Sequence, residues 1–430
     1  MNFSFSDALS KLENIADSGS KYELERIKLL LEIMGNPEKK YKIIHITGTK
    51  GKGSTGAILS GLLKRHIKTG FFSSPHLNQP NERIRIDNNM ISEKEFSENL
   101  YEIWEYIERV KKLTGLYPSY FECMTALAYY TFSKNKIRLA IVEVGLGGRL
   151  DATNVANGDI CILTRISYDH TKILGNTLKD ISREKAGIIK KDSIVININR
   201  SKEIMYQIKK RCREVKAYGC FTPFNRIRIK VISDNINSSI IDIKGKKYLF
   251  ENIIFPLGGS FQLENLSLAL TAIEFLEKKG FTIELDKEDF DNIDWPGRFE
   301  IINKDPIVII DGAHNSISAK RLKEHVKKVF PEGIIMLVGI LADKNYMDFI
   351  KETSRISNNI IITTVNNKRA LKPDIFADEF YRANSKARIF IEKDRKKAYN
   401  KAIIMAKKLK LPILITGSLY LIGEYKKGHH

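Results

Sequence analysis

Residues 43–63 read IIHITGTKGKGSTGAILSGLL: an apolar run, then glycines, lysines and hydroxyls, then apolar residues again at helical spacing. The first part predicts a buried strand, and the part from about Ser54 to His66 predicts a helix. Gly48, Gly51 and Gly53 let the backbone between them approach a ligand closely. Because the N–H groups of such a loop and the start of the following helix attract anions, the segment predicts a phosphate-binding loop.

The loop departs from the strict P-loop pattern G-x-x-x-x-G-K-[ST], since Gly53 stands between Lys52 and Ser54. The physical chemistry still holds. Lys52 would neutralise oxygens of the β- and γ-phosphates, and Ser54 or Thr55 could contact phosphate or a metal. The alternative is an ordinary glycine-rich turn between strand and helix, but the lysines and hydroxyls favour phosphate. By itself the loop indicates a nucleotide and no particular reaction.

Composition and charge exclude several classes of protein. A chain of 430 residues is too long for one core, so we expect two domains. The net charge of +20 permits a nucleic-acid partner, but the basic residues are spread along the chain without a recognition motif, and they would equally attract small anions. No apolar run reaches the roughly 20 residues that span a membrane. Scattered cysteines and the lack of a secretion signal predict a cytoplasmic protein with neither nucleic-acid nor membrane partners.

The order of apolar segments predicts an α/β fold with two domains. From residue 41 to residue 198, β-branched runs alternate with amphipathic helical segments, which is typical of a mostly parallel sheet with helices on both faces. Short alternating segments in residues 225–255 predict antiparallel pairing. The pattern restarts after DWPGRFEII, so we expect a P-loop-type domain over residues 1–297 and a smaller, Rossmann-like α/β domain over residues 298–430.

Polar residues follow three of the expected strands. Ser73 and Ser74 end the second strand, Glu143 ends an apolar strand before a glycine turn, and His170 follows another strand, with Lys185 on the next helix. Each signal is weak alone, because a buried carboxylate or a lone histidine is often structural. Strand ends of open α/β sheets meet at one crevice, however, and the glycine loop faces the same crevice.

These motifs resemble those of the folylpolyglutamate synthase/dihydrofolate synthase family, within the Mur ligase superfamily of ATP-dependent amide-forming enzymes. The resemblance covers essentially the whole chain. It is carried, in order, by HITGTKGKGST, SSPHL with NERIRI, EVGLGGRLDATN, DHTKILGNTL with EKAGIIK, SFQLEN, WPGRFE, IIDGAHN, GILADKN and TGSLYLIGE. One departure is Lys50, where the family loop usually has asparagine.

The resemblance implies a set of site residues. Those matching the ATP contacts are Gly51, Lys52, Gly53, Ser54, Thr55, Asn265, Arg298, Asp311 and His314. Those matching ligands of two magnesium ions are Ser74, Glu143 and His170, with Lys185 as a lysine that CO₂ converts to a carbamate. Those matching the pterin or glutamate side are Phe121, Glu122, Asp151 and Ser418. Lys52, His170 and Lys185 would take part in catalysis. Without the resemblance, Lys185 would be taken for a surface lysine.

The implied reaction joins a folate or pteroate carboxylate to the amine of L-glutamate through an acyl phosphate formed from ATP. Because carboxylate and triphosphate repel each other, the site must supply countercharge, which explains the lysines and the magnesium. No protein nucleophile is expected, and the family suggests a monomer. The alternatives are a Mur ligase acting on a UDP-linked cell-wall precursor, a basic nucleic-acid-dependent NTPase, and a non-catalytic nucleotide-binding module. The sequence leaves open whether dihydropteroate, reduced folate or both are accepted.

Overall fold

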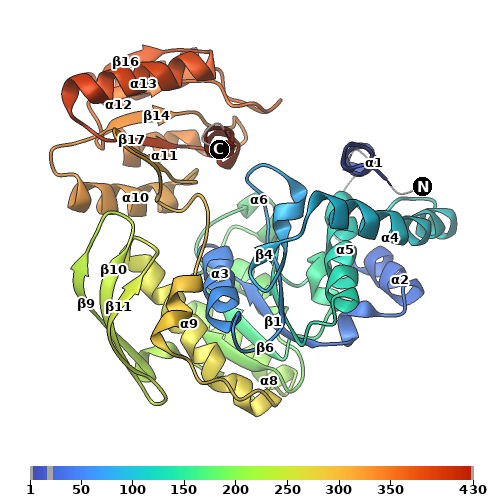
Figure 1. Ribbon diagram of the computed structural model, residues 1–430. Coiled ribbons are helices and arrows are strands. Elements are labelled where there is room, and N and C mark those ends of the chain that lie inside the picture. The colour runs from blue at the N-terminus through green and yellow to red at the C-terminus, as the bar shows by residue number, and fades with distance from the viewer. Residues whose placement is uncertain (1–2, 17–22, 428–430) are drawn as a thin grey trace.

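The computed structural model describes residues 3–16 and 23–427 and forms two lobes (Figure 1). The N-terminal lobe contains an eight-stranded sheet in the order β4-β3-β2-β5-β1-β6-β7-β8, in which all pairs except β2–β3 and β3–β4 are parallel. The strands are β1 (Lys42–Thr47), β2 (Thr69–Phe72), β3 (Ile84–Ile86), β4 (Asn89–Met90), β5 (Leu139–Glu143), β6 (Ile160–Leu163), β7 (Ile194–Asn197) and β8 (Gly219–Phe221).

Helices cover both faces of this sheet because its central strands are apolar on both sides. In β1, Ile44 and Ile46 pack against α3 (Lys52–Leu63) and α9 (Ser260–Leu276), whereas Ile43 faces the opposite layer. The opposite layer contains α1 (Phe5–Ala16), α2 (Glu25–Ile33), α4 (Glu93–Thr114), α5 (Tyr120–Lys134), α7 (Leu178–Ala186) and α8 (Lys202–Glu214). The predicted parallel sheet with helices on both faces is confirmed.

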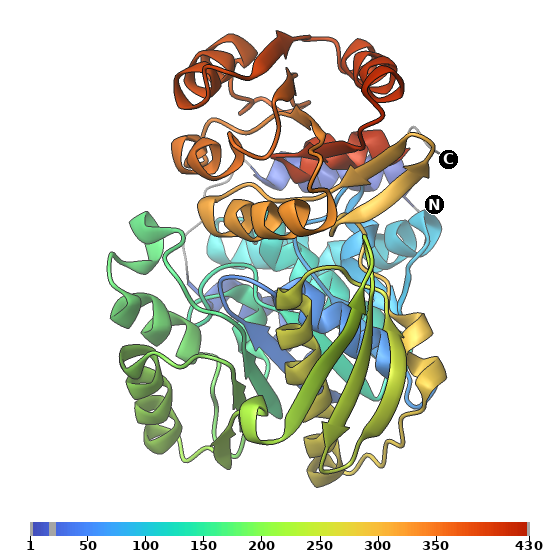
Figure 2. The same cartoon turned by 90° about the vertical axis from the view of Figure 1, so that its left-hand side faces the viewer.

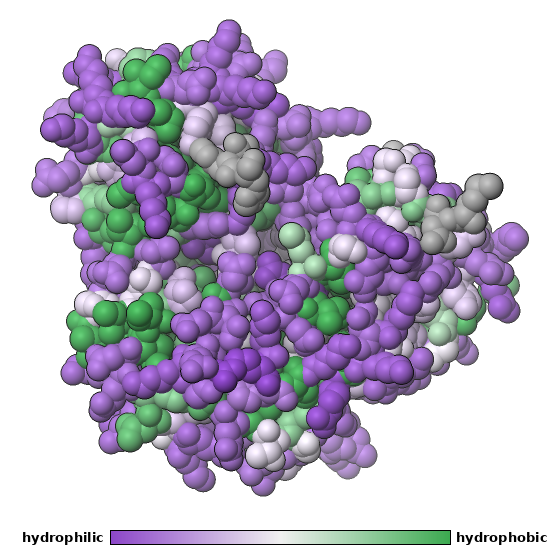
Figure 3. Space-filling model, viewed as in Figure 1, coloured by the Kyte–Doolittle hydropathy of each residue, from purple (hydrophilic) through white to green (hydrophobic). Residues whose placement is uncertain are grey.

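Residues 227–255 form the predicted antiparallel sheet, made of β9 (Ile227–Asp234), β10 (Ser239–Gly245) and β11 (Leu249–Phe255). Its inner face packs on the core that α3 and α9 share, and Figure 2 shows the three strands beside α9. Figure 3 shows a mostly hydrophilic face on which apolar side chains form separate patches. Within the described residues, no helix is both long and apolar enough to cross a membrane.

The C-terminal lobe is the predicted smaller α/β unit. Its six-stranded sheet has the order β12-β13-β17-β14-β15-β16 and is parallel apart from the β12–β13 pair. The strands are β12 (Glu300–Lys304), β13 (Ile307–Ile310), β14 (Ile335–Val338), β15 (Asn359–Ile362), β16 (Arg388–Ile391) and β17 (Ile413–Thr416). The helices are α10 (Ser316–Val329), α11 (Tyr346–Thr353), α12 (Pro373–Ala383), α13 (Arg395–Leu409) and α14 (Leu419–Lys427).

Two details differ from the sequence prediction. Helix α3 begins at Lys52 rather than Ser54, because Gly51 adopts the left-handed conformation (φ 93°) that starts the helix directly after the loop, and it ends at Leu63 rather than His66. Strand β12 was not expected as an antiparallel edge. The division at 297/298 stays our proposal, supported by the start of β12 at Glu300.

Candidate active site

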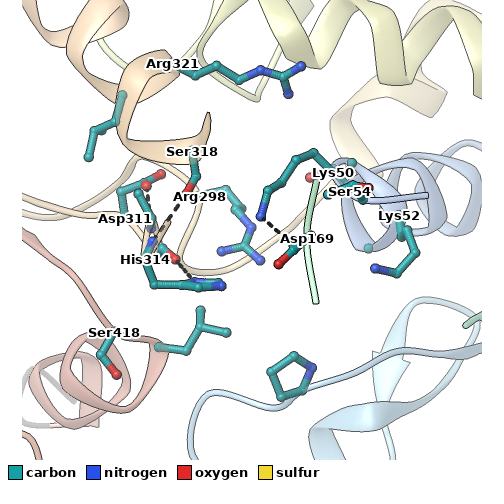
Figure 4. Close-up of a pocket in the computed structure, with 18 of the residues that line it drawn as sticks. Lys50, Lys52, Ser54, Asp169, Arg298, Asp311, His314, Ser318, Arg321 and Ser418 are labelled. Atoms are coloured by element: carbon teal, nitrogen blue, oxygen red, sulfur yellow. Dashed lines mark hydrogen bonds and ion pairs between the residues drawn. The ribbon is translucent and has the colours of Figure 1, made fainter. Parts of the chain in front are cut away.

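A cavity of about 430 Å³ lies between the two lobes. Its N-terminal wall is formed by the loop between β1 and α3 and by residues that follow β2, β5 and β6, and its C-terminal wall by residues that follow β13 and β17. The carboxyl ends of parallel strands meet there, as expected for open α/β sheets. Figure 4 shows side chains from both lobes pointing into this space. The predicted residues that line it are Gly51, Lys52, Gly53, Ser54, Ser74, Glu143, His170, Asn265, Arg298, Asp311, His314 and Ser418.

The phosphate loop is held by its neighbours before any ligand binds. The backbone N–H groups of Thr49 and Lys50 donate to the carbonyl oxygen of Arg165, at 2.8 and 3.2 Å. At Gly51, a Cβ atom would lie 2.3 Å from Oδ1 of Asn265, so only glycine fits between the loop and α9. The loop is therefore preorganised, and its position at the start of α3 suits an anion.

Glu143 is the buried carboxylate of the cavity. Only 4% of the residue is exposed. Its Oε2 accepts the backbone N–H of Ser74 at 3.1 Å, and its Oε1 lies 3.8 Å from Nζ of Lys52. Burial raises the pKa of Glu143, and the charge of Lys52 opposes that shift. A second cation at this point would stabilise the ionised form, because an opposite charge nearby favours it.

His170 lines the same cavity at the start of the short helix α6 (Thr171–Leu174) and adopts a left-handed backbone conformation (φ 49°). Burial lowers the pKa of His170, so a nitrogen lone pair is available near neutral pH. Among the described residues, no group of three or more His, Cys, Asp or Glu side chains could hold a metal by itself. Magnesium commonly takes one or two carboxylates and completes its shell with phosphate and water, so Glu143 and Ser74 fit it chemically.

Lys185 lies behind the cavity rather than on its wall. The residue is 4% exposed, and its Nζ donates to the carbonyl oxygen of Gly48 at 2.9 Å. Burial, together with the charge of Lys52, lowers the pKa of Lys185 to about 7. A substantial fraction of this amine is therefore neutral at neutral pH, and a surface lysine is excluded.

The C-terminal lobe contributes a second polar wall. Asp311 accepts the backbone N–H groups of Ala313 and Phe299, at 2.9 and 3.0 Å, and so fixes the turn after β13. Nδ1 of His314 lies 2.8 Å from the carbonyl oxygen of Gly312 and must donate to it, which leaves Nε2 as an acceptor. Burial lowers the pKa of His314 to about 3, so this ring is neutral.

Four other predicted residues do not line the cavity. Thr55 is fully buried, and its hydroxyl has no hydrogen-bond partner among the described residues. Glu122 accepts the backbone N–H of Ser119 and pairs with Arg26 at 3.3 Å, so it caps α5. Phe121 packs against Phe72, with ring centroids 5.9 Å apart.

Asp151, the fourth, braces the glycine turn after β5. Its Oδ2 accepts the N–H of Leu146 at 2.8 Å, and its Oδ1 accepts the hydroxyl of Thr153 at 2.6 Å. Pterin contacts by Asp151 and Glu122 stay predictions. Both oxygens of Asp151 already accept structural hydrogen bonds, whereas Oε1 of Glu122 has no hydrogen-bond partner among the described residues.

The cavity also contains residues that the sequence did not single out. Among them are His76, Asp169, Arg321, Lys344, Arg369 and Tyr420. Several lie within motifs that carried the resemblance, such as SSPHL, GILADKN and TGSLYLIGE. The motifs were the available signal, but only the fold shows which of their side chains face the cavity.

Lys50, the departure from the family pattern, points into the cavity towards Asp169 (Figure 4). Its Nζ lies 3.6 Å from Oδ2 of Asp169, and its side chain is 15% exposed. Burial lowers the pKa of Lys50 to about 8, and the charge of Arg298 acts in the same direction. An ammonium at this point adds to the positive charge that faces an entering anion.

We therefore expect Lys50→Asn to raise the KM for ATP by roughly fivefold at pH 7. This fold-change corresponds to the loss of a partly screened charge contact of about 1 kcal/mol. The ratio of the two KM values should fall above pH 8, because the ammonium of Lys50 loses its proton there. Measuring KM for both proteins between pH 6.5 and 9 checks this. A ratio that does not change with pH would contradict it.

Comparisons with known proteins agree with this geometry. The family model described as "Mur ligase middle domain" matches residues 46–273, and the one described as "Mur ligase, glutamate ligase domain" matches residues 297–419. The phosphate loop and the buried carboxylate lie in the first match, and His314 and Ser418 lie in the second. The fold and site thus define the class of protein, a ligase of the Mur type.

Similar proteins narrow the class. The dihydrofolate synthase/folylpolyglutamate synthase of Bacillus subtilis is 32% identical over 98% of each chain. The structure of Mycobacterium tuberculosis folylpolyglutamate synthase complexed with ADP and AMPPCP has a TM-score of 0.89 at 27% identity and covers 99% of both chains. E. coli FolC in complex with DHPP and ADP has a TM-score of 0.83 at 26% identity, over 99% of this chain and 97% of that one.

The chain belongs to the folylpolyglutamate synthase/dihydrofolate synthase family. The prediction of an ATP-dependent ligase in folate metabolism is confirmed over the alternatives of a ligase for UDP-linked precursors and a nucleic-acid-dependent NTPase.

Proposed function

We propose that the cavity between the lobes binds ATP, primes a pteroate or folate carboxylate as an acyl phosphate, and joins it to the amine of L-glutamate. The observation that carries this proposal is the position of Lys52. Its ammonium lies at the start of α3 and 3.8 Å from Glu143, in one cavity with Arg298, His314 and Ser418 from the other lobe. The groups proposed for the phosphates and those proposed for the glutamate side thus line one cavity.

The residues act by position and charge. Lys52 and the N–H groups of the loop would hold the terminal phosphates, and Arg298 would meet the same anion from the opposite wall. The acyl phosphate forms when a carboxylate oxygen attacks the γ-phosphorus and ADP leaves. The amine of glutamate then attacks the acyl carbon, a proton is lost from nitrogen, and inorganic phosphate leaves. Ser418, which is buried beside the cavity, is a candidate for the glutamate side.

We further propose that Glu143, Ser74 and His170 hold magnesium together with the nucleotide phosphates. When bound, the ion supplies countercharge to the transferring phosphoryl group. The neutral amine of Lys185 would add to CO₂, giving a carbamate and a proton. The side chain would then carry an anionic oxygen that can bind magnesium, instead of a positively charged ammonium. Two observations support this assignment: burial lowers the pKa of Lys185 and raises the pKa of Glu143. Burial thus disfavours the charged form of each group, and a bound cation would stabilise the carboxylate and the carbamate.

For the acceptor, we propose that both dihydropteroate and reduced folate are used, because the Bacillus subtilis relative carries both names. The test is ADP release with ATP, magnesium and glutamate, with dihydropteroate in one reaction and tetrahydrofolate in the other. We expect release that depends on glutamate with each acceptor. No release with either would refute the proposal, and release with only one would restrict the substrate class.

We also propose a monomer in the cytoplasm without a nucleic-acid partner. The even distribution of basic residues and the lack of a recognition motif support the absence of a nucleic-acid partner, and the net charge of +20 instead favours anionic substrates. Adding polynucleotide should leave the rate of ADP release unchanged, whereas stimulation that disappears at higher salt would contradict this part of the proposal.

A further inference from the structure

Trp295 lies in the segment of residues 293–299 between the two lobes, and it fills a notch in the phosphate loop. Its Cζ2 atom lies 2.7 Å from the position that a Cβ atom on Gly53 would occupy, and its Cε2 atom lies 3.3 Å from that position. A side chain at residue 53 would therefore collide with the indole. Gly53 is also the residue that breaks the strict P-loop spacing, so this extra glycine makes the room in which Trp295 packs.

Further contacts clamp the indole within the N-terminal lobe. The ring centroid of Phe71 lies 5.6 Å away at an interplanar angle of 46°, and the guanidinium of Arg85 lies 5.2 Å from the indole. Oε2 of Glu143 lies 3.2 Å from the same Cβ position on Gly53, so indole and carboxylate approach the loop together. The buried indole N–H has no hydrogen-bond partner in the described part of the chain, so packing rather than hydrogen bonding holds the ring.

The residues just after Trp295 belong to the other lobe. The carbonyl oxygen of Gly297 accepts the N–H of Gly312 at 3.0 Å, and the N–H of Phe299 donates to Asp311 at 3.0 Å. Only Pro296 separates Trp295 from Gly297, whose φ is +74°. Proline fixes its own φ, and the N–H of Gly297 donates to Glu300 at 2.7 Å. The connection between the indole and the C-terminal lobe is therefore short and constrained.

We propose that Trp295 is a positioning residue for ligation: seated against Gly53, it sets the angle at which the C-terminal lobe presents Arg298 to the phosphate loop. Arg298 follows Trp295 by three residues and lines the cavity. Its charge reaches both Glu143 and Lys50 in the N-terminal lobe. The inference rests on the ligase function described above, and it assigns Trp295 no contact with substrate.

The test is a double-mutant cycle on the full chain with Trp295→Ala, Arg298→Ala and both together. Because a misplacement of about 1 Å costs roughly 100-fold in rate, we expect Trp295→Ala to lower kcat by roughly 10- to 100-fold. The Kd for ADP should change by less than about threefold, since the loop itself stays intact, and Trp295→Phe should recover most of the lost rate. If Trp295 acts through Arg298, the double variant is no slower than Arg298→Ala alone. Effects that multiply, or an unchanged kcat in Trp295→Ala, would overturn the proposal.

A second measurement does not depend on turnover or on the folding of Trp295→Ala. The chain has two tryptophans, and the other is Trp104 on α4, whose indole N–H donates to Glu108. In Trp104→Phe, Trp295 is the only tryptophan, and titration with ADP should shift the tryptophan emission along the calorimetric binding curve. Constant emission during saturation with ADP would refute contact between Trp295 and the occupied loop. If the unmodified chain uses neither acceptor, the ligase proposal fails, and this titration still tests Trp295.

Discussion

Lys52→Ala should abolish ligation while leaving the chain folded. Lys52 is the ammonium nearest to the buried Glu143 and stands at the first residue of α3, where the phosphates of ATP would lie. Loss of one such group typically costs about 3–4 kcal/mol of transition-state stabilisation, so the rate of ADP release should fall by roughly 100- to 1,000-fold. The measurement is ADP release with saturating glutamate and either acceptor.

The matched control is Lys64→Ala, which removes an exposed lysine just after the same helix and should keep normal turnover. The thermal midpoint of Lys52→Ala should stay close to that of the unmodified chain, because the contact with Glu143 is long, at 3.8 Å, and the buried carboxyl can take up a proton when the ammonium is removed. Near-normal turnover in Lys52→Ala would refute the phosphate role. Lost turnover together with a collapsed melting curve would point to folding instead.

The parts of the fold that follow local rules could be predicted from the sequence. The strand, loop and helix around Gly51 could be predicted because apolar periodicity and glycine spacing are properties of neighbouring residues. The positions of Glu143 and His170 at the cavity could be predicted because the ends of parallel strands meet at one edge of a sheet. Both residues line one cavity with Lys52, as expected when strand ends and the glycine loop face the same crevice.

The remaining features arise from contacts between distant segments. The resemblance places Asp151 on the pterin side, and that contact stays a prediction. The structure adds that its oxygens hold the turn after β5, a role that local sequence does not reveal. Gly53 looked like an anomaly of the loop until the fold brought Trp295 against it from 242 residues away. Lys344 and Tyr420 could likewise not be identified from the sequence, since only the packing of the two lobes places them on the wall of the same cavity as the phosphate loop.

Lys185→Ala should also remove activity, and small carboxylic acids should restore part of it. A free ammonium at this place would repel a divalent cation, whereas the carbamate would bind one, so the lysine serves the reaction only after it reacts with CO₂. The burial that holds the pKa of Lys185 near 7 keeps much of the amine neutral and able to react. Truncation to alanine leaves space in which acetate or formate can supply an anionic oxygen instead.

We expect a loss of at least about 100-fold in ADP release, comparable with removal of one charge-stabilising group, and a recovery that grows with the concentration of added acetate. Lys179→Ala, which removes an exposed lysine of the same helix α7, is the matched control and should be neutral. The unmodified chain should lose activity in CO₂-free buffer and regain it with bicarbonate. Full activity of Lys185→Ala would exclude a role for the carbamate. Full activity of the unmodified chain without CO₂ would exclude it as well, because an uncarboxylated lysine cannot supply the anionic oxygen that the cation needs.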